Sequence, residues 1–126
     1  MKLYRDEVSD LQLVTSYDAT HLGINRESYT ASLIVMPDKL VTGWAPGGFD
    51  ALTAADFQQI RALDPALVLI GTGARQRFPK PALLRALIEA QIGYEVMDTG
   101  SACRTYNILA SEGRVVAAAL LLDAQA

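Results

Sequence analysis

The alternation of short apolar strands with helical segments constrains the fold of this chain most. Leu67–Ile70 is wholly apolar, as is typical of a strand buried on both faces of a parallel sheet, and Gly71-Thr72-Gly73 ends it. Tyr94–Met97 and Val115–Leu122 are the next two predicted strands. Strands that alternate with helices predict a right-handed βαβαβ core. The last strand follows a tight turn at Glu112-Gly113, so it could also run antiparallel.

The first helix of this core has a start signal and a stop signal. Thr53 is a good N-cap residue, and Asp56 three positions later resembles the acidic partner of a capping box. Apolar residues then recur at helical spacing at Phe57, Ile60 and Leu63. Asp64-Pro65 should end the helix, because the residue before proline disfavours helical backbone.

Two more helices are expected on either side of the Tyr94–Met97 strand. Pro81 suits the first position of the second helix, and Gly93 suits its C-cap. Thr99 or Ser101 is expected to cap the third helix, which should run through Leu109.

The N-terminal third has strand signals instead. Leu11–Thr15 and Tyr29–Val35 are apolar or alternating runs, and Gly23–Arg26 between them carries turn residues. Leu33–Met36 and Leu40–Trp44 flank a proline-containing turn and are expected to form a hairpin. We therefore predict an α/β fold: a three-layer sandwich with a mostly parallel central sheet and an N-terminal β extension.

Composition narrows the class of protein. The 126 residues are enough for one domain, expected over residues 1–126, and 51% hydrophobic with 20% charged residues argues against disorder. A net charge of -3 gives no global attraction to nucleic acid or to an anionic membrane. The single cysteine excludes an internal disulfide. Met1–Glu7 is too charged for a signal peptide, and Val115–Leu122 is too short to span a bilayer. We expect a cytoplasmic protein that is not embedded in a membrane.

A candidate binding crevice lies where two predicted strands end, because open α/β sheets bind ligands beyond the carboxyl ends of their strands. The segments concerned are Gly71–Arg77 and Asp98–Arg104. Small residues there could expose backbone N–H groups to a phosphate or carboxylate. The residues expected to line this ligand or partner crevice are Gly71, Gly73, Arg75, Thr99, Arg104, Thr105 and Asn107.

The basic residues near this crevice have two interpretations. Arg75, Arg77, Lys80 and Arg85 follow one another with no acidic residue between them, yet a solvated charged loop explains them better than an anion site. Arg104 and Asn107 are three positions apart and share a helix face. They could bind a small anion, or Asn107 could satisfy backbone groups while Arg104 pairs with Asp98 or Glu112.

No catalytic constellation emerges from the residues. Gly71-Thr72-Gly73 lacks the third glycine of a dinucleotide fingerprint. Cys103-Arg104 lacks the later arginine of a phosphatase loop, and Cys103 is expected to be a buried, inert thiol. His21 is the only histidine and lies far from it in sequence, and no cluster has metal-ligand spacing. We predict no catalytic residues, cofactor or metal, and core packing for Trp44.

The C-terminal half resembles a known family. The stretch from Met97 to Leu109, followed by Glu112 to Leu120, is similar to the signature of a widespread family of small uncharacterised proteins. Further matches are Gly23-Ile24-Asn25, Trp44, and Gly71-Thr72-Gly73 with Gly93, so the resemblance covers about Gly23 to Leu122. Its members include an assembly factor of mitochondrial respiratory complex I, an adipogenesis-associated protein and a methanobacterial hypothetical protein. The family tends to have a proline near the end of the last strand, where this chain has Leu121-Leu122-Asp123.

The resemblance implies a three-layer α/β fold with an added β layer, no established enzyme activity, and action through protein contacts. We therefore favour a non-enzymatic protein-interaction or assembly-factor-like module with a protein partner and no nucleic acid. The alternative is a binder or enzyme for a small anionic ligand in the crevice between Gly73 and Arg104.

Overall fold

Two β-sheets form the framework of the protein. The computed structural model describes residues 11–123. The small sheet is an antiparallel meander in the order β1-β2-β3, and the large sheet has the order β5-β4-β8-β6-β7. The strands are β1 Val14–Asp18, β2 His21–Ile24, β3 Glu27–Tyr29, β4 Leu33–Met36, β5 Lys39–Thr42, β6 Leu67–Thr72, β7 Gly93–Met97 and β8 Val116–Leu121.

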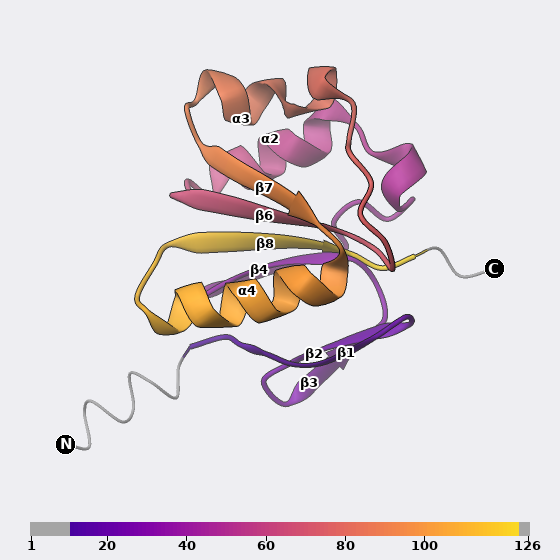
Figure 1. The fold of residues 1–126 in the computed structure, drawn as a ribbon, viewed down its shortest axis with the longest axis vertical. Helices are drawn as coiled ribbons and strands as arrows, with labels where there is room; N and C mark the ends of the chain where they lie inside the picture. Colours follow the sequence, from indigo (N-terminus) through magenta and orange to yellow (C-terminus); the bar gives the residue numbers. More distant parts are fainter. Residues whose placement is uncertain (1–10, 124–126) are drawn as a thin grey trace.

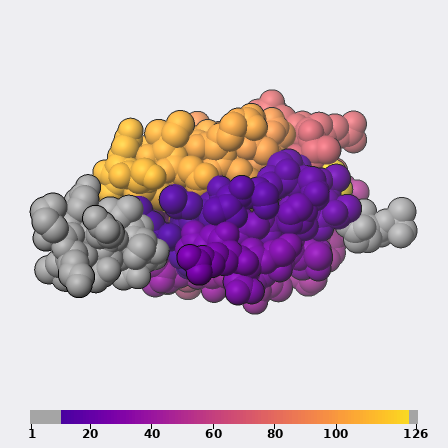
Figure 2. All heavy atoms as spheres, turned by 90° about the horizontal axis from the view of Figure 1, so that it is seen from below, coloured from indigo at the N-terminus to yellow at the C-terminus, as the bar shows by residue number. Residues whose placement is uncertain are grey.

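Helices cover both faces of the large sheet (Figure 1). One face carries α2 and α3, and the other face carries α4. The small sheet lies beside α4 on that second face, as the view in Figure 2 also shows. The helical elements are the 3₁₀ turn η1 Phe49–Ala51, α2 Ala54–Ala62, the 3₁₀ turn η2 Pro81–Leu84, α3 Arg85–Glu89 and α4 Thr99–Ser111. Between residues 11 and 123, no helix is long and apolar enough to cross a membrane.

The large sheet is mixed, so the prediction of a mostly parallel sheet is wrong. β6 runs parallel to both β7 and β8, whereas β4 runs antiparallel to both β5 and β8. The physical reason is the β4–β5 hairpin, which joins the large sheet at β8 and does not stay in the N-terminal extension. The last strand therefore has one parallel and one antiparallel neighbour.

The N-terminal strands differ from the predicted ranges. β1 begins at Val14, and β2 occupies Gly23 and Ile24, where a turn was expected. The turn comes one residue later, at Asn25, which takes a left-handed φ of 52°. The predicted run Tyr29–Val35 is divided between the end of β3 and the start of β4.

The large sheet is buried on both faces, as expected for Leu67–Ile70. Side chains of β6 alternate: Leu69 joins the core under α4 and the small sheet, while Val68 and Ile70 join the core under α2 and α3. Trp44 is buried in the second core, donates its indole N–H to the Asp56 carbonyl at 2.9 Å, and lies edge-to-face with Phe57. The core role predicted for this tryptophan is confirmed.

Helix ends were predicted with mixed success. The capping box of Thr53 and Asp56 at the start of α2 is present. The cap of α4, in contrast, is Asp98, whose carboxylate accepts the Ser101 N–H at 2.8 Å. The expected cap residue Thr99 is the first residue of the helix instead.

The second predicted helix is also shorter and less regular than expected. Pro81 starts a 3₁₀ turn that leads into the five-residue α3. Gly93 is not its C-cap but the first residue of β7, and Gln91 takes the left-handed conformation with a φ of 58°.

Candidate functional site

The carboxyl ends of β6 and β7 meet at one edge of the sheet, and Thr99 joins them from the start of α4. Its hydroxyl is fully buried, accepts the Gly73 N–H at 2.7 Å and donates to the Leu121 carbonyl at 2.7 Å. The Thr99 N–H in turn donates to the Gly73 carbonyl at 2.9 Å. This one side chain therefore links the end of β6, the end of β8 and the first turn of α4.

Both glycines of the β6 end are required by their surroundings. A Cβ at Gly71 would lie 2.9 Å from the Thr99 Cα and 3.2 Å from the Ala102 Cβ. Gly73 has a φ of +95°, a conformation that L-residues rarely adopt. α4 can therefore pack directly against the end of β6.

The loop after β6 is held by its own polar groups. The Arg77 guanidinium donates to the Thr72 carbonyl at 2.6 Å and to the Asp123 carboxylate at 3.0 Å, and it lies 4.5 Å from the centre of the Phe49 ring. The other Asp123 oxygen accepts the Ala74 N–H at 3.0 Å. Asp123, in the segment that departs from the family's proline pattern, thus pairs with Arg77 beside the end of β6.

The four basic residues of this region lie in different environments. Arg75 is exposed, and its carbonyl accepts the Thr72 hydroxyl at 2.7 Å. Lys80 lines a hollow beside Phe78, and Arg85 lines a separate groove on the helical layer. Arg77 is paired as described above.

The α4 residues of the predicted crevice point to different neighbours. The half-buried Asn107 amide accepts the Val14 N–H at 2.9 Å and donates to the Val14 carbonyl at 2.7 Å, so it binds β1. Arg104 is exposed and donates to the Ser101 hydroxyl at 3.2 Å. Thr105 is half-buried. Arg104 and Asn107 line a small hollow of about 250 Å³ between β1 and α4.

Cys103 is buried, as predicted. Burial raises the pKa of its thiol to about 12, because the thiolate would lose its hydration. At neutral pH the thiol is therefore protonated and a poor nucleophile. The charge of the adjacent Arg104 lowers this pKa and that of Asp98 raises it, and burial has the largest effect.

A polar row on the β1–β2 hairpin was missed in the sequence. The His21 Nδ1 lies 2.8 Å from the Asp18 carboxylate, and its Nε2 lies 3.3 Å from the Ser16 hydroxyl. The Asp18 carboxylate also accepts the backbone N–H groups of Thr20 and His21, which holds its pKa at about 2. This pattern closes an exposed turn, and the signal for it was the Asp18-Ala19-Thr20-His21 sequence, a typical Asx turn.

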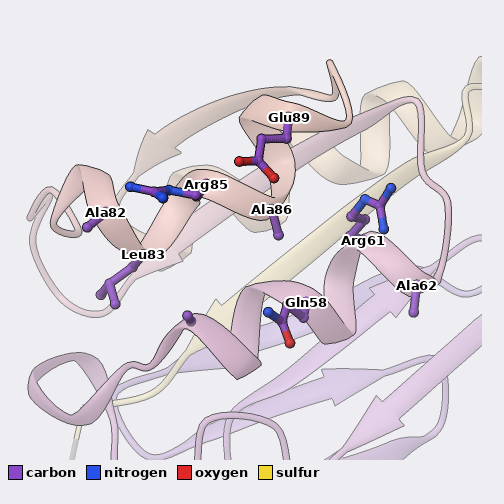
Figure 3. A pocket seen from close by; sticks show the side chains of 9 residues that line it. Gln58, Arg61, Ala62, Ala82, Leu83, Arg85, Ala86 and Glu89 are labelled. Carbon is purple, nitrogen blue, oxygen red and sulfur yellow. The ribbon is translucent and has the colours of Figure 1, made fainter.

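The largest hollow described lies on the helical layer, away from the strand ends. It is a groove of about 690 Å³ between α2 and the η2–α3 segment (Figure 3). Sequence reasoning did not find it, because its lining alternates alanines with single polar residues in two distant segments. The lining residues are Ala54, Gln58, Arg61, Ala62, Ala82, Leu83, Arg85, Ala86 and Glu89.

A known protein-family model matches most of this chain. The model described as "Protein of unknown function (DUF498/DUF598)" matches residues 14–121. The chain belongs to this family. The match spans β1 to β8 and so includes the Thr99 junction, the Asn107 contact with β1 and the α2–α3 groove.

Relatives in the DUF498/DUF598 family include named assembly factors. The chain is 34% identical over 110 residues to "NADH dehydrogenase [ubiquinone] 1 alpha subcomplex assembly factor 3" of Bos taurus, covering 86% of this chain and 59% of the relative. This chain therefore spans about three-fifths of that relative's length.

Solved structures share the fold. A crystal structure of a Bordetella parapertussis protein has 38% identity and a TM-score of 0.82, covering 90% of this chain and 97% of the other. A solution structure of a Bordetella pertussis protein, titled a Mth938-like domain, has 30% identity and a TM-score of 0.81, covering 94% and 90% of the two chains.

Proposed function

We propose that this chain is a protein-interaction module that assists the assembly of a multi-subunit complex and carries out no chemistry of its own. The observation that carries the proposal is its relation to proteins named as assembly factors of NADH dehydrogenase. The proposal extends the activity of longer relatives to a chain that matches part of their length. It places the action in the cytoplasm, in keeping with a single buried cysteine.

The geometry of the strand ends supports this proposal. Small-molecule sites present a few precisely placed polar groups to the ligand. At the β6 and β7 ends, the Thr99 hydroxyl, the Thr72 hydroxyl and the Arg77 guanidinium all hold parts of the chain itself. The anion-binding alternative therefore gains no support from these contacts. Kinship with the methanobacterial and adipogenesis-associated proteins stays a prediction.

A deletion experiment tests the proposal. Deleting the gene in its native organism should lower the amount of one mature multi-subunit complex while its individual subunits or subcomplexes accumulate. Native gels followed by quantitative mass spectrometry measure both quantities. Re-expression of the wild-type chain should restore the complex. Unchanged levels of every detectable complex in the deletion strain would contradict the proposal.

A further inference from the structure

The loop after β6 holds the Asp123 carboxylate through both of its oxygens. One oxygen accepts from the Arg77 guanidinium at 3.0 Å, and the other accepts the Ala74 N–H at 3.0 Å. A Cβ at Gly73 would collide with the oxygen that Arg77 binds, so the missing side chain makes room for the carboxylate. An arginine and a backbone N–H are the groups that bind carboxylates most strongly. Gly73, Ala74 and Arg77 therefore form a carboxylate site, called the β6-end site below.

The arginine of the β6-end site is oriented by contacts that do not involve Asp123. Its guanidinium donates to the Thr72 carbonyl at 2.6 Å and lies 4.5 Å from the centre of the Phe49 ring. The Arg77 N–H also donates to the Thr72 hydroxyl at 2.9 Å. A side chain that is already held in place loses little freedom when it binds a ligand. The site is thus preorganised for a carboxylate from any source.

Asp123 itself is tied down less firmly than its neighbour. Between residues 11 and 123, both of its hydrogen bonds come from the carboxylate, whereas the Leu122 backbone N–H donates to the Ser32 hydroxyl at 3.0 Å. The Asp123 side chain is 41% exposed, and ion pairs that are open to solvent contribute little net stability. Asp123 also lines a hollow of about 110 Å³, which leaves room for the side chain to turn. Its carboxylate can therefore leave while the backbone before it stays anchored.

A tethered carboxylate competes well with free anions and poorly with a docked protein. Asp123 lies two residues beyond the end of β8 at Leu121, and a group on so short a tether has an effective concentration of about millimolar. A free anion must exceed this concentration to replace it. A protein that is already bound elsewhere on the surface presents its own side chains at a similar local concentration. An acidic side chain of a docked protein is therefore the competitor that can displace Asp123.

We propose that Asp123 fills the β6-end site in the free protein and that an aspartate or glutamate of a partner protein replaces it in the complex. Asp123 then acts as an internal competitor, and partners are selected for an acidic side chain at this point of the contact. The inference rests on the proposed function and names the site and the partner group.

Removing the internal competitor tests this proposal. The Asp123→Ala variant is titrated with N-acetyl-aspartate N-methylamide, which presents a carboxylate as a protein chain does. Nuclear magnetic resonance of the labelled protein follows the backbone amides of Gly73, Ala74 and Arg77. The variant should show saturable shifts at these amides, and the wild-type chain should need about tenfold more probe, or more, for the same shifts.

Three controls isolate the charge and the place of the site. N-acetyl-asparagine N-methylamide has the same shape without the charge and should bind Asp123→Ala about tenfold more weakly than the acidic probe does. Glu89→Ala removes an equal charge from an exposed position on α3 and should behave as the wild type does. Asp123→Asn keeps the size of the side chain, so it serves where alanine alters the loop, and it too should bind the acidic probe more tightly than the wild type.

Other results would overturn the proposal. Equal affinity of the acidic probe for the wild-type chain and for Asp123→Ala would reject the internal competition. Equal shifts from the two probes, or no shifts in either Asp123 variant up to the solubility limit of the probe, would reject the carboxylate site. The deletion experiment measures the proposed function separately, so loss of a complex in the deletion strain without probe binding would reject the site alone.

Discussion

Replacing Thr99 by valine measures how strongly the strand ends are tied together. Valine keeps the branched shape of threonine but removes the hydroxyl that bonds Gly73 and Leu121. Each buried group left without a partner costs about 1–3 kcal/mol. The Thr99 side chain is fully buried, so water does not replace the lost contacts. Two groups lose a partner, the Gly73 N–H and the Leu121 carbonyl. The expected loss in the free energy of unfolding is about 2–4 kcal/mol, the lower part of the range summed over both groups, because Leu121 also lies in the β-ladder.

Urea denaturation followed by circular dichroism measures this loss, with the slope of the transition expected to stay unchanged. Thr105→Val is the matched control: the residue is half-buried in the same helix, and its hydroxyl makes no hydrogen bond within the described part of the chain. The control should change stability by less than about 0.5 kcal/mol. Equal effects of the two variants would refute the reasoning and leave the Thr99 hydroxyl available for another role.

Four further predictions follow from the same contacts. Asn107→Ala should destabilise the protein by about 1–3 kcal/mol and speed hydrogen exchange in β1, since it removes two hydrogen bonds to that strand. Gly71→Ala should lower the midpoint of urea unfolding, because its Cβ would lie 2.9 Å from a backbone atom, whereas Gly93→Ala, with its nearest contact at 3.6 Å, should have a smaller effect. Cys103, whose thiol pKa is raised to about 12, should resist a thiol reagent at pH 8 in the native protein and react fully in denaturant. The pKa of Asp18 is lowered from 3.8 to about 2, so its contribution to hairpin stability is present above pH 4 and is lost as the pH falls toward 2, as amide exchange of the hairpin can measure.

Local signals predicted the core of the fold well. The Thr53–Asp56 box, the two-sided burial of the Leu67–Ile70 strand and the hairpin before Gly43 all depend on residues close together in sequence. The pairing of β4 with β8 does not, because the antiparallel contact of Ile34 with Ala119 joins residues from opposite ends of the chain. The mixed character of the sheet could not be deduced from either strand alone.

In the candidate site, too, features set by nearby residues were predicted and contacts between distant residues were not. The sequence predicted that the ends of β6 and β7 meet, because the carboxyl ends of neighbouring parallel strands lie at the same edge of an α/β sheet. It could not predict that the Arg77 guanidinium would find Asp123, since these residues are paired only through the tertiary fold. The α2–α3 groove went unnoticed for the related reason that alanines carry no signal of chemistry.

The central claim is that the protein acts through protein contacts. Its most direct test is the apparent molecular mass of the native protein at its endogenous level. Gel filtration of a native extract, with the chain detected by antibody, gives this size. A substantial fraction of the protein is expected in an assembly much larger than the free chain. Migration of the wild-type chain entirely as the free protein would contradict the claim.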